Sequence, residues 1–447
     1  MTETGRDREI VLDMLLEVIE DKKFSHTVLN QVLKKHQEMD KQQRAFISRL
    51  FTGTVVRYLT LDYYINSFAS LKVEKMKPLI RNLLRLSVYQ ILYMDQIPES
   101  AVCNEAVKLA KKRGFSKLSG FVNAILRNII RNRETLALPD KDTNPALYLE
   151  AAYSFPSWLA KHLLAQYDYQ QLEAMLASSL REKETSIRCN LLRSNPKELR
   201  QLLEAEGVRV KDSEYLDYAF RISSYDHLER LDSFRRGLFT VQDVSSMLVC
   251  EAAGLKNTDF VVDVCSAPGG KALHAAQIAA KVSARDLTEY KAGLIRENMT
   301  RLGAGNVEVK VWDATVTDPS LIGKADVVLA DLPCSGLGVI GKKADIKYRL
   351  TPAGLKELEE LQMSILSVVK DYVKPGGILI YSTCTVNRDE NQKIRNWFLE
   401  HFDFQAESLD PYLPESLKNK DTKEGYLQLL QGIHGTDGFF LTRLRRR

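Results

Sequence analysis

Several features of membrane and secreted proteins are missing from this sequence of 447 residues. No run of about eighteen apolar residues occurs, so we expect no membrane-spanning helix. Residues 1–8 are polar and lack the apolar stretch of a signal peptide, which argues against secretion and favours the cytoplasm. A cytoplasmic protein with no membrane contact is therefore the expectation.

Cysteine is also scarce, and no two cysteines form a C-x-x-C pair. Such spacing suits neither a zinc site nor a disulfide framework, so we expect reduced thiols. The seven histidines are scattered, and we expect no metal site. The six cysteines are Cys103, Cys189, Cys250, Cys265, Cys334 and Cys384.

The composition, 45% hydrophobic and 27% charged, is that of a globular chain long enough for two or three domains. The net charge of +5 is too small to identify a nucleic-acid binder, but its distribution is uneven. Residues 101–135 hold eight basic side chains against two acidic ones, a cluster that can follow a phosphate backbone or simply be a solvated helix face. The basic residues are Lys108, Lys111, Lys112, Arg113, Lys117, Arg127, Arg131 and Arg133.

Residues 1–140 are expected to form an all-α domain. Apolar positions cover most of a helix surface over 83–94, a second helix follows over 100–112, and 121–129 has a third amphipathic face. After a linker at 136–146, residues 147–237 predict a small α+β module. It has a helical stretch over 156–181, a strand over 187–192, a helix capped by Asn195 and Pro196 that ends at Gly207, and an extended segment at 208–210.

Residues 238–447 alternate short apolar runs with helical stretches. The runs at 260–264, 282–284, 307–311, 327–330 and 378–381 are predicted strands, and 355–373 is a predicted helix. This pattern indicates an α/β domain with a mostly parallel, doubly wound, Rossmann-like sheet. In that fold the ligand lies at the carboxyl ends of the strands.

A glycine-containing loop follows the first of these strands and opens a helix. Its two adjacent glycines allow close approach of the backbone to a ligand, but the loop is neither a dinucleotide fingerprint nor a phosphate loop. A tight turn alone would also require glycine. We expect cofactor contacts from Cys265, Ser266, Ala267, Pro268, Gly269, Gly270 and Lys271.

Acidic residues end the successive strands. Asp286 lies 23 residues after Asp263, the spacing at which an acid accepts both ribose hydroxyls of a nucleoside. Asp313 and Asp331 end the next two strands. Any one aspartate is more often a helix N-cap, but four in register suit a sulfonium cation and an adenine amino group.

Cys334 and Cys384 follow the fourth and fifth strands, beside the expected cofactor. A lone cysteine is usually structural, whereas two at adjacent strand ends suggest chemistry. A thiolate that adds to carbon 6 of cytosine makes carbon 5 nucleophilic, and a second thiol can assist release. Lys271 could raise the thiolate fraction, and Asp331 could stabilise the charge that develops on the ring.

The motifs at these positions resemble the bacterial ribosomal RNA cytosine-5 methyltransferases of the Sun/Fmu (RsmB) group, within the NOL1/NOP2/Sun family. The resemblance implies that S-adenosylmethionine is the cofactor, Cys384 the nucleophile and Cys334 the release cysteine, with Asp286, Asp313 and Asp331 lining the cofactor site. It rests on the cofactor loop 265–271, the cysteine motifs 331–336 and 382–384, and the last strand at 437–440.

The front of the chain, through 83–90 and 121–127, resembles a NusB-type helical domain. In this family that fusion is typical of an enzyme acting on one cytosine of 16S ribosomal RNA, free or in an early small-subunit particle. Two departures occur: Ser266 replaces a more usual alanine, and 341–345 lacks the arginine, histidine and proline common before Asp345. The second leaves contacts to the flanking RNA open.

Two alternatives stand beside this interpretation. A DNA cytosine methyltransferase would use the proline-linked Cys334 as nucleophile and leave Cys384 idle. A ribosome-assembly or antitermination factor would bind RNA through the helical domain, with a vestigial methyltransferase fold. The intact cysteine pair and acid series favour an RNA enzyme, which we expect to act as a monomer.

Overall fold

The computed structural model describes residues 3–36, 38–181 and 184–447 of the chain, which divides into two compact units. Unit 1 comprises Met1–Leu180 together with Ile340–Arg349, and unit 2 comprises Arg181–Val339 together with Leu350–Arg447. Among the described residues, every helix is too short or too polar to cross a bilayer.

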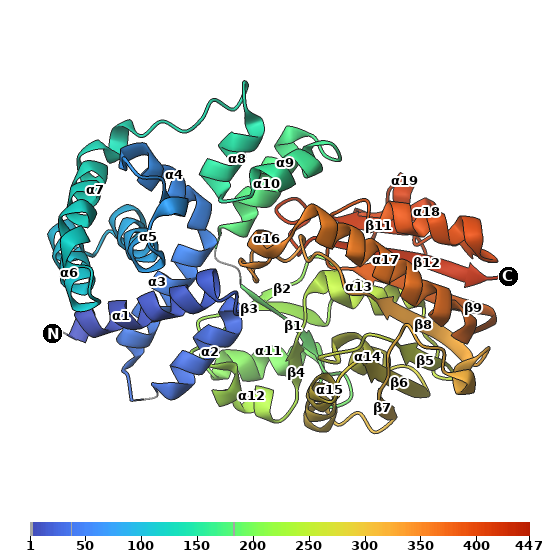
Figure 1. The fold of residues 1–447 in the computed structure, drawn as a ribbon. Coiled ribbons are helices and arrows are strands. Elements are labelled where there is room, and N and C mark those ends of the chain that lie inside the picture. Colours follow the sequence, from blue (N-terminus) through green and yellow to red (C-terminus); the bar gives the residue numbers. More distant parts are fainter. Residues whose placement is uncertain (1–2, 37, 182–183) are drawn as a thin grey trace. The chain divides into compact units, whose positions relative to one another are not determined.

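Unit 1 is helical throughout its described part, as predicted for residues 1–140 (Figure 1). Helix α5 is its centre, and nearly all of its residues from Ile80 to Ile91 are buried, because apolar side chains occur around its whole circumference. Its α-helices are α1 (Glu3–Leu15), α2 (Ser25–Lys35), α3 (Lys41–Val56), α4 (Tyr58–Phe68), α5 (Pro78–Tyr93), α6 (Glu99–Lys112), α7 (Ser119–Asn132), α8 (Pro145–Tyr153), α9 (Ser157–Leu164), α10 (Tyr169–Ser179) and the short α16 (Ile346–Arg349).

The helical pattern predicted over 156–181 is confirmed, and it is divided into two helices, α9 and α10. Asp168 separates them: its side chain accepts a hydrogen bond of 2.8 Å from the backbone N–H of Gln171 and so caps the start of α10. The apolar periodicity continues across this break, so the spacing of apolar residues alone does not show where α9 ends and α10 begins.

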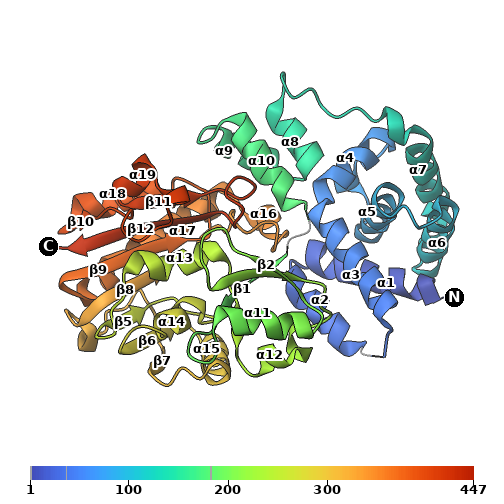
Figure 2. The same cartoon turned by 180° about the vertical axis from the view of Figure 1, so that it is seen from behind.

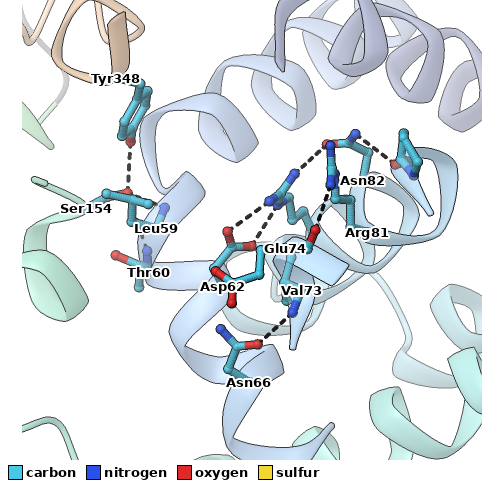
Figure 3. A network of polar contacts seen from close by, with 12 residues as sticks. Leu59, Thr60, Asp62, Asn66, Val73, Glu74, Arg81, Asn82, Ser154 and Tyr348 are labelled. Carbon is cyan, nitrogen blue, oxygen red and sulfur yellow. Dashed lines mark hydrogen bonds and ion pairs between the residues drawn. The ribbon is translucent and has the colours of Figure 1, made fainter. Parts of the chain in front are cut away.

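Asp62 and Asn82 belong to a network of polar contacts in unit 1 (Figure 3), in which both are bonded to the buried Arg85. The guanidinium donates two hydrogen bonds of 2.7 and 2.8 Å to Asp62 and a third of 2.9 Å to Asn82. Asn82 in turn donates to Glu20 at 2.7 Å. Each polar group of this network therefore has a partner, as burial requires.

The ten residues Ile340–Arg349 lie in unit 1 although both flanking segments belong to unit 2. The Tyr348 hydroxyl donates to the backbone carbonyl of Val56 and lies 2.8 Å from Ser154 Oγ (Figure 3). The Lys347 ammonium, 2% exposed, donates to backbone carbonyls of Val56 and Tyr153. Burial without a carboxylate partner lowers the pKa of Lys347 to about 7.

A four-stranded antiparallel sheet opens unit 2, in the order β2-β3-β1-β4. The strands are β1 (Thr185–Cys189), β2 (Arg209–Asp212), β3 (Ala219–Ser223) and β4 (Phe239–Val241), and α11 (Pro196–Ala205) and α12 (Asp232–Arg235) accompany them (Figure 2). The cap at α11 is as predicted, with Asn195 accepting from Glu198 N at 3.0 Å. The predicted strand 187–192 ends earlier, because Leu191 and Leu192 are exposed loop residues.

The larger sheet of unit 2 has the order β10-β12-β9-β8-β5-β6-β7, with β11 paired to β12. Strands β7, β6, β5, β8 and β9 are parallel and confirm the predicted runs, whereas β12 pairs antiparallel with β9. The strands are β5 (Phe260–Asp263), β6 (Lys281–Asp286), β7 (Val307–Val311), β8 (Ala325–Asp331), β9 (Val373–Thr383), β10 (Phe404–Ala406), β11 (Tyr426–Leu429) and β12 (Phe439–Arg446).

Alternate side chains of the parallel strands enter two separate cores. Val261 and Leu329 pack with α13 (Val244–Ala253), α14 (Gly270–Ala275) and α15 (Glu289–Leu302), while Val262 and Val328 pack with α17 (Pro352–Val369) and α18 (Gln392–His401). Helices thus cover both faces of the sheet, which leaves the strand ends to form a site.

Candidate active site

The order of the parallel strands reverses between β5 and β8, the two neighbours from which the sheet grows outward. Helices leave such a point on opposite faces, so the loops after β5 and β8 diverge and leave a crevice. A cavity of about 280 Å³ lies there. Its lining comes from the ends of β5 to β8 and from α17, and consists of Val264, Cys265, Ala267, Asp286, Leu287, Lys291, Trp312, Asp313, Ala314, Thr315, Asp331, Leu332, Pro333, Leu361 and Ile365.

The predicted cofactor loop makes a tight turn after β5. Ser266 N donates to the carbonyl of Arg285, and Gly269 N donates back to the carbonyl of Ser266 at 2.7 Å. Gly269 has a φ of 103°, a conformation that L side chains rarely adopt. Of the loop residues, Cys265 and Ala267 line the cavity directly, whereas Ser266, Pro268, Gly269, Gly270 and Lys271 form the rest of the turn and the start of α14.

Asp286 is held tightly at the end of β6. One carboxylate oxygen accepts from Ala267 N at 2.9 Å, and the other accepts from Leu287 N at 2.8 Å and pairs with the Lys291 ammonium at 3.0 Å. These contacts fix the carboxylate against the cofactor loop. Each oxygen keeps lone-pair capacity for a hydroxyl donor.

Asp313, after β7, is exposed in the cavity. One carboxylate oxygen accepts from the backbone N–H and hydroxyl of Thr315 at 2.9 and 2.7 Å. These hydrogen bonds hold the pKa of Asp313 below its usual range. Its second oxygen is available to an amino group on a ligand.

Asp263 differs from the other strand-end acids, because it is 1% exposed and does not line the cavity. Within the described residues, neither carboxylate oxygen has a hydrogen-bond partner of good geometry. Burial raises the pKa of Asp263 to about 7, with Lys271 acting in the opposite sense. An unsatisfied buried carboxylate beside an acid-lined cavity suits a cationic nucleoside ligand.

Lys271 and Asp331 form an ion pair of 2.6 Å between the cofactor loop and the end of β8. The other oxygen of Asp331 accepts from the Ser382 hydroxyl at 2.8 Å, which ties β8 to β9. Burial disfavours the Lys271 ammonium, but the charge of Asp331 outweighs it, and the pKa of Lys271 is raised. A negative charge on Cys384 acts on Lys271 in the same direction.

Cys334 and Cys384 lie side by side, with 3.3 Å between their sulfur atoms. The parallel pairing of β8 with β9 explains this, because it sets Asp331 opposite Ser382 and brings both following loops to one edge. Both thiols are partly exposed, as is Cys265, whereas Cys103, Cys189 and Cys250 are buried. The two cysteines predicted to react are therefore brought together.

A buried polar cluster lies beside the thiols and is not predicted from the sequence. It is centred on Glu390, which is 0% exposed, and includes Ser335, Gln362, Asn387 and Asn391. The only signal in the sequence is a polar run, 387–391, soon after Cys384, and such runs are usually solvated loops.

The basic cluster of α6 and α7 is partly neutralised. Lys108 pairs with Glu105, and Arg133 with Glu99; Lys112 and Arg113 pair with Glu9 and Asp13 of α1. In the described part of the chain, Lys111, Lys117, Arg127 and Arg131 form no ion pair. A groove of about 510 Å³ between these helices is lined by Glu99, Ser100, Cys103, Asn104, Arg127, Ile130 and Arg131.

Histidine, cysteine and acidic side chains do not gather into a metal-binding group anywhere in residues 3–36, 38–181 and 184–447.

Three family models match successive parts of the chain. Residues 6–131 match the NusB family, residues 155–227 match the "Methyltr_RsmF/B-like, ferredoxin-like domain", and residues 252–445 match "16S rRNA methyltransferase RsmB/F". The N-terminal helical domain is thus NusB-like, as its sequence predicts.

Curated relatives extend over the same length. A probable ribosomal RNA small subunit methyltransferase B of Bacillus subtilis (strain 168) is 35% identical over 446 residues, covering 98% of each chain. A protein of the same name from Synechocystis sp. (strain ATCC 27184 / PCC 6803 / Kazusa) is 30% identical over 448 residues, covering 98% of this chain and 99% of its own.

Solved structures agree on the fold. The crystal structure of PH0851 matches with a TM-score of 0.82 and 25% identity over the full length of both chains. That of NSun6 from Pyrococcus horikoshii with SFG covers 67% of this chain and 99% of its own, with a TM-score of 0.59 and 20% identity.

These likenesses identify the cofactor and the family. The cofactor is S-adenosylmethionine, and the acids, apolar walls and unsatisfied Asp263 described above suit this cationic nucleoside. The chain belongs to the 16S rRNA methyltransferase RsmB/F family and is an S-adenosylmethionine-dependent rRNA methyltransferase.

Proposed function

We propose that the protein methylates carbon 5 of one cytosine in 16S ribosomal RNA through a covalent adduct with Cys384. The observation that carries this proposal is the 3.3 Å contact between Cys334 and Cys384 beside the Lys271–Asp331 pair. Methylation of a nitrogen or of a hydroxyl needs no thiol nucleophile, whereas carbon 5 of cytosine does, because the intact ring does not react there.

In the first step the Cys384 sulfur bonds to carbon 6, and the electrons of the 5,6 double bond move toward carbon 5. Lys271 favours the thiolate form of Cys384 electrostatically, and the Lys271–Asp331 pair can hold a proton at ring nitrogen 3 or carbonyl oxygen 2 as charge develops. The target base must leave its stack to reach these groups.

S-adenosylmethionine, when bound, supplies the electrophilic methyl group. We propose that Asp286 accepts its ribose hydroxyls and Asp313 its adenine amino group, while Asp331 and the loop residues Cys265, Ser266, Ala267, Pro268, Gly269 and Gly270 shape the rest of the seat.

Release requires that the proton on carbon 5 leave. Its bonding electrons then restore the 5,6 double bond, and the carbon 6–sulfur bond breaks to return Cys384 as a thiolate. We assign assistance in this step to Cys334, whose sulfur lies against that of Cys384.

RNA binding is proposed for the helical domain, residues 1–140. In this proposal the chain has two further parts, the small module 147–237 and the catalytic domain 238–447. The unpaired basic residues of α6 and α7 support this role, because they are free to meet phosphates. Such an enzyme would act in the cytoplasm, on 16S RNA that is free or in an early small-subunit particle.

The deciding experiment measures transfer of labelled methyl groups to undermodified small-subunit RNA and maps the labelled nucleotide. Cys384→Ala is expected to abolish transfer, and Cys334→Ala to accumulate a protein–RNA adduct stable to denaturation. If Cys334→Ala prevents the adduct and Cys384→Ala retains activity, the roles are reversed. No transfer to any RNA, or label at another atom, would overturn the proposal.

A further inference from the structure

The carboxylate of Glu390 is buried between the loops that carry the two cysteines. It accepts four hydrogen bonds: from Ser335 N at 2.8 Å, Ser335 Oγ at 2.5 Å, Asn387 Nδ2 at 3.0 Å and Gln362 Nε2 at 3.1 Å. It acts only as an acceptor in these contacts, the pattern of an ionised carboxylate. Burial raises the pKa of Glu390, and the four donors oppose that rise.

These contacts hold the residues on both sides of Cys334 in the chain. Ser335, the residue after the cysteine, donates to the carboxylate through both its backbone and its side chain. Gln362 donates to the carboxylate and also to the carbonyl of Pro333, the residue before the cysteine, at 2.9 Å. The position of the Cys334 sulfur is therefore set from Glu390.

The same carboxylate reaches the loop of Cys384. Asn387 joins it from that loop, and the hydroxyls of Ser335 and Thr385 are 2.7 Å apart. Gly338 N donates to the carbonyl of Cys384 at 3.0 Å. Glu390 thus connects the two loops across which the sulfur–sulfur contact forms.

Charge near the two thiols is unequal. Hydrogen bonding to Cys384 and burial, together with negative charge on Cys384 and Glu390, raise the pKa of Cys334 well above its usual value. Cys384 interacts instead with the Lys271 ammonium, which Asp331 holds in place. Other ionisable groups near this cluster are Tyr381, whose pKa burial raises, Glu359, paired with Lys393, and Asp389, which lines a surface groove.

We propose that Glu390 is a positioning residue that sets the two thiols against each other and keeps the negative charge of the pair on Cys384. Cys334 then holds its proton in the resting enzyme and hydrogen-bonds to the Cys384 thiolate. Once Cys384 is bonded to the base, that hydrogen bond and its charge are gone, so Cys334 can pass its proton to solvent and, as a thiolate, take the proton from carbon 5. The inference rests on the proposed covalent function for its catalytic meaning, but not for its test.

The first test measures alkylation of Cys334 by iodoacetamide against pH, with peptide mapping by mass spectrometry and without RNA. In a Cys384→Ala background, adding Glu390→Gln is expected to move the midpoint for Cys334 to lower pH and to raise the alkylation rate at neutral pH several-fold. Equal midpoints with and without Glu390→Gln would overturn the proposal. This readout stands even if no RNA is ever methylated, so the two proposals fail separately.

Asp389→Asn is the matched control, because it removes a neighbouring carboxylate that faces a separate surface groove. It is expected to leave the Cys334 midpoint unchanged. A shift equal to that of Glu390→Gln would show a general effect of charge and would remove the assignment to Glu390.

The second test uses the otherwise intact chain. Glu390→Gln is expected to lower kcat for methyl transfer about tenfold or more and to change its pH profile, with little change in KM for S-adenosylmethionine. Because Glu390→Gln could impair folding, Asn387→Ala removes one donor to the same carboxylate as a milder variant. An unchanged pH profile in every folded variant would contradict the proposal.

Discussion

Asp62 lies partly buried within helix α4 of unit 1, and Asp263 lies fully buried at the end of β5 in unit 2, yet the surroundings of the two carboxylates are opposite. Asp62 receives two hydrogen bonds from Arg85, which is itself bonded to Asn82. Asp263 forms no ion pair or hydrogen bond of good geometry in the described residues, and Lys271 acts on it only from a distance, since that ammonium is paired with Asp331. A buried acid with hydrogen-bond partners is compatible with a stable fold. A buried acid without partners lowers the free energy of unfolding, and it is retained where ligand binding offsets that cost.

Removing the cation from the Arg85–Asp62 pair should have the largest effect on the stability of the protein. Arg85→Met leaves the partly buried carboxylate of Asp62 without its cation, so we expect a loss of about 3 kcal/mol in the free energy of unfolding. Chemical denaturation measures it. Activity per folded molecule should persist, and the double variant with Asp62→Leu should recover much of the stability. A single variant as stable as the wild type would show that the pair is not structural.

Lys271→Ala tests the paired charge on the catalytic side. Lys271 holds Asp331 and faces Cys384, so we expect methyl transfer to fall about 10²- to 10³-fold while the melting temperature changes little. Lys374→Ala, which breaks a lysine–aspartate pair with Asp326 at the other end of the sheet, is the matched control. Equal losses in both variants would mean that Lys271 acts only through the fold.

The pH dependence of stability tests Asp263 directly. Its folded pKa of about 7 lies above the unfolded value of about 3.9, so this group stabilises the fold fully below pH 4, and its contribution is lost as pH rises through 7. Between pH 5 and pH 8 the loss is about 2–3 kcal/mol. His274, whose pKa burial lowers well below its usual value, contributes with the opposite sign. Comparing unfolding of the wild type with Asp263→Asn isolates the aspartate, and identical pH profiles would contradict its raised pKa.

Within the described residues, the basic residues of α6 and α7 also divide into charges that have a carboxylate partner and charges that have none. Neutralising the unpaired Arg127 and Arg131 with Gln is expected to weaken RNA binding about tenfold and to reduce the salt slope by about one per lost phosphate contact. Neutralising the paired Lys112 and Arg113 should have a smaller effect. Filter binding at several salt concentrations measures both, and the reverse order would place the RNA elsewhere.

The smallest effect is expected at Asp313. It is exposed and already bonded to Thr315, so Asp313→Asn should raise KM for S-adenosylmethionine only a few-fold and leave kcat nearly unchanged. A fall in kcat with unchanged KM would instead assign Asp313 to the chemical step.

Much of the fold follows from the sequence, because strand burial and helix caps are local. The five parallel strands occur where apolar runs predict them, and Asn195 caps its helix as expected. The break at Asp168 is missed because the apolar face continues across it. The partial neutralisation of the basic cluster could not be foreseen either, since Glu9 and Asp13 come from about a hundred residues away.

The candidate site divides in the same way. The strand ends and the motifs around Cys334 and Cys384 suffice to predict that these residues lie at one edge of a sheet. Glu390 and Gln362 carry no such signal, because their importance lies in hydrogen bonds that only the folded loops create. The 3.3 Å contact between the thiols is likewise a product of strand register.

The helical unit is discontinuous along the chain, since Ile340–Arg349 completes it only after strands β5 to β8 of the larger sheet, with β9 to β12 still to follow. A single cut near residue 181 therefore does not yield two self-sufficient fragments. The C-terminal piece would carry Lys347 and Tyr348 away from their carbonyl partners at Val56 and Tyr153. During synthesis, the first 180 residues of unit 1 are therefore made well before its packing can be complete. Its last ten residues, 340–349, follow only after Cys334 has been made.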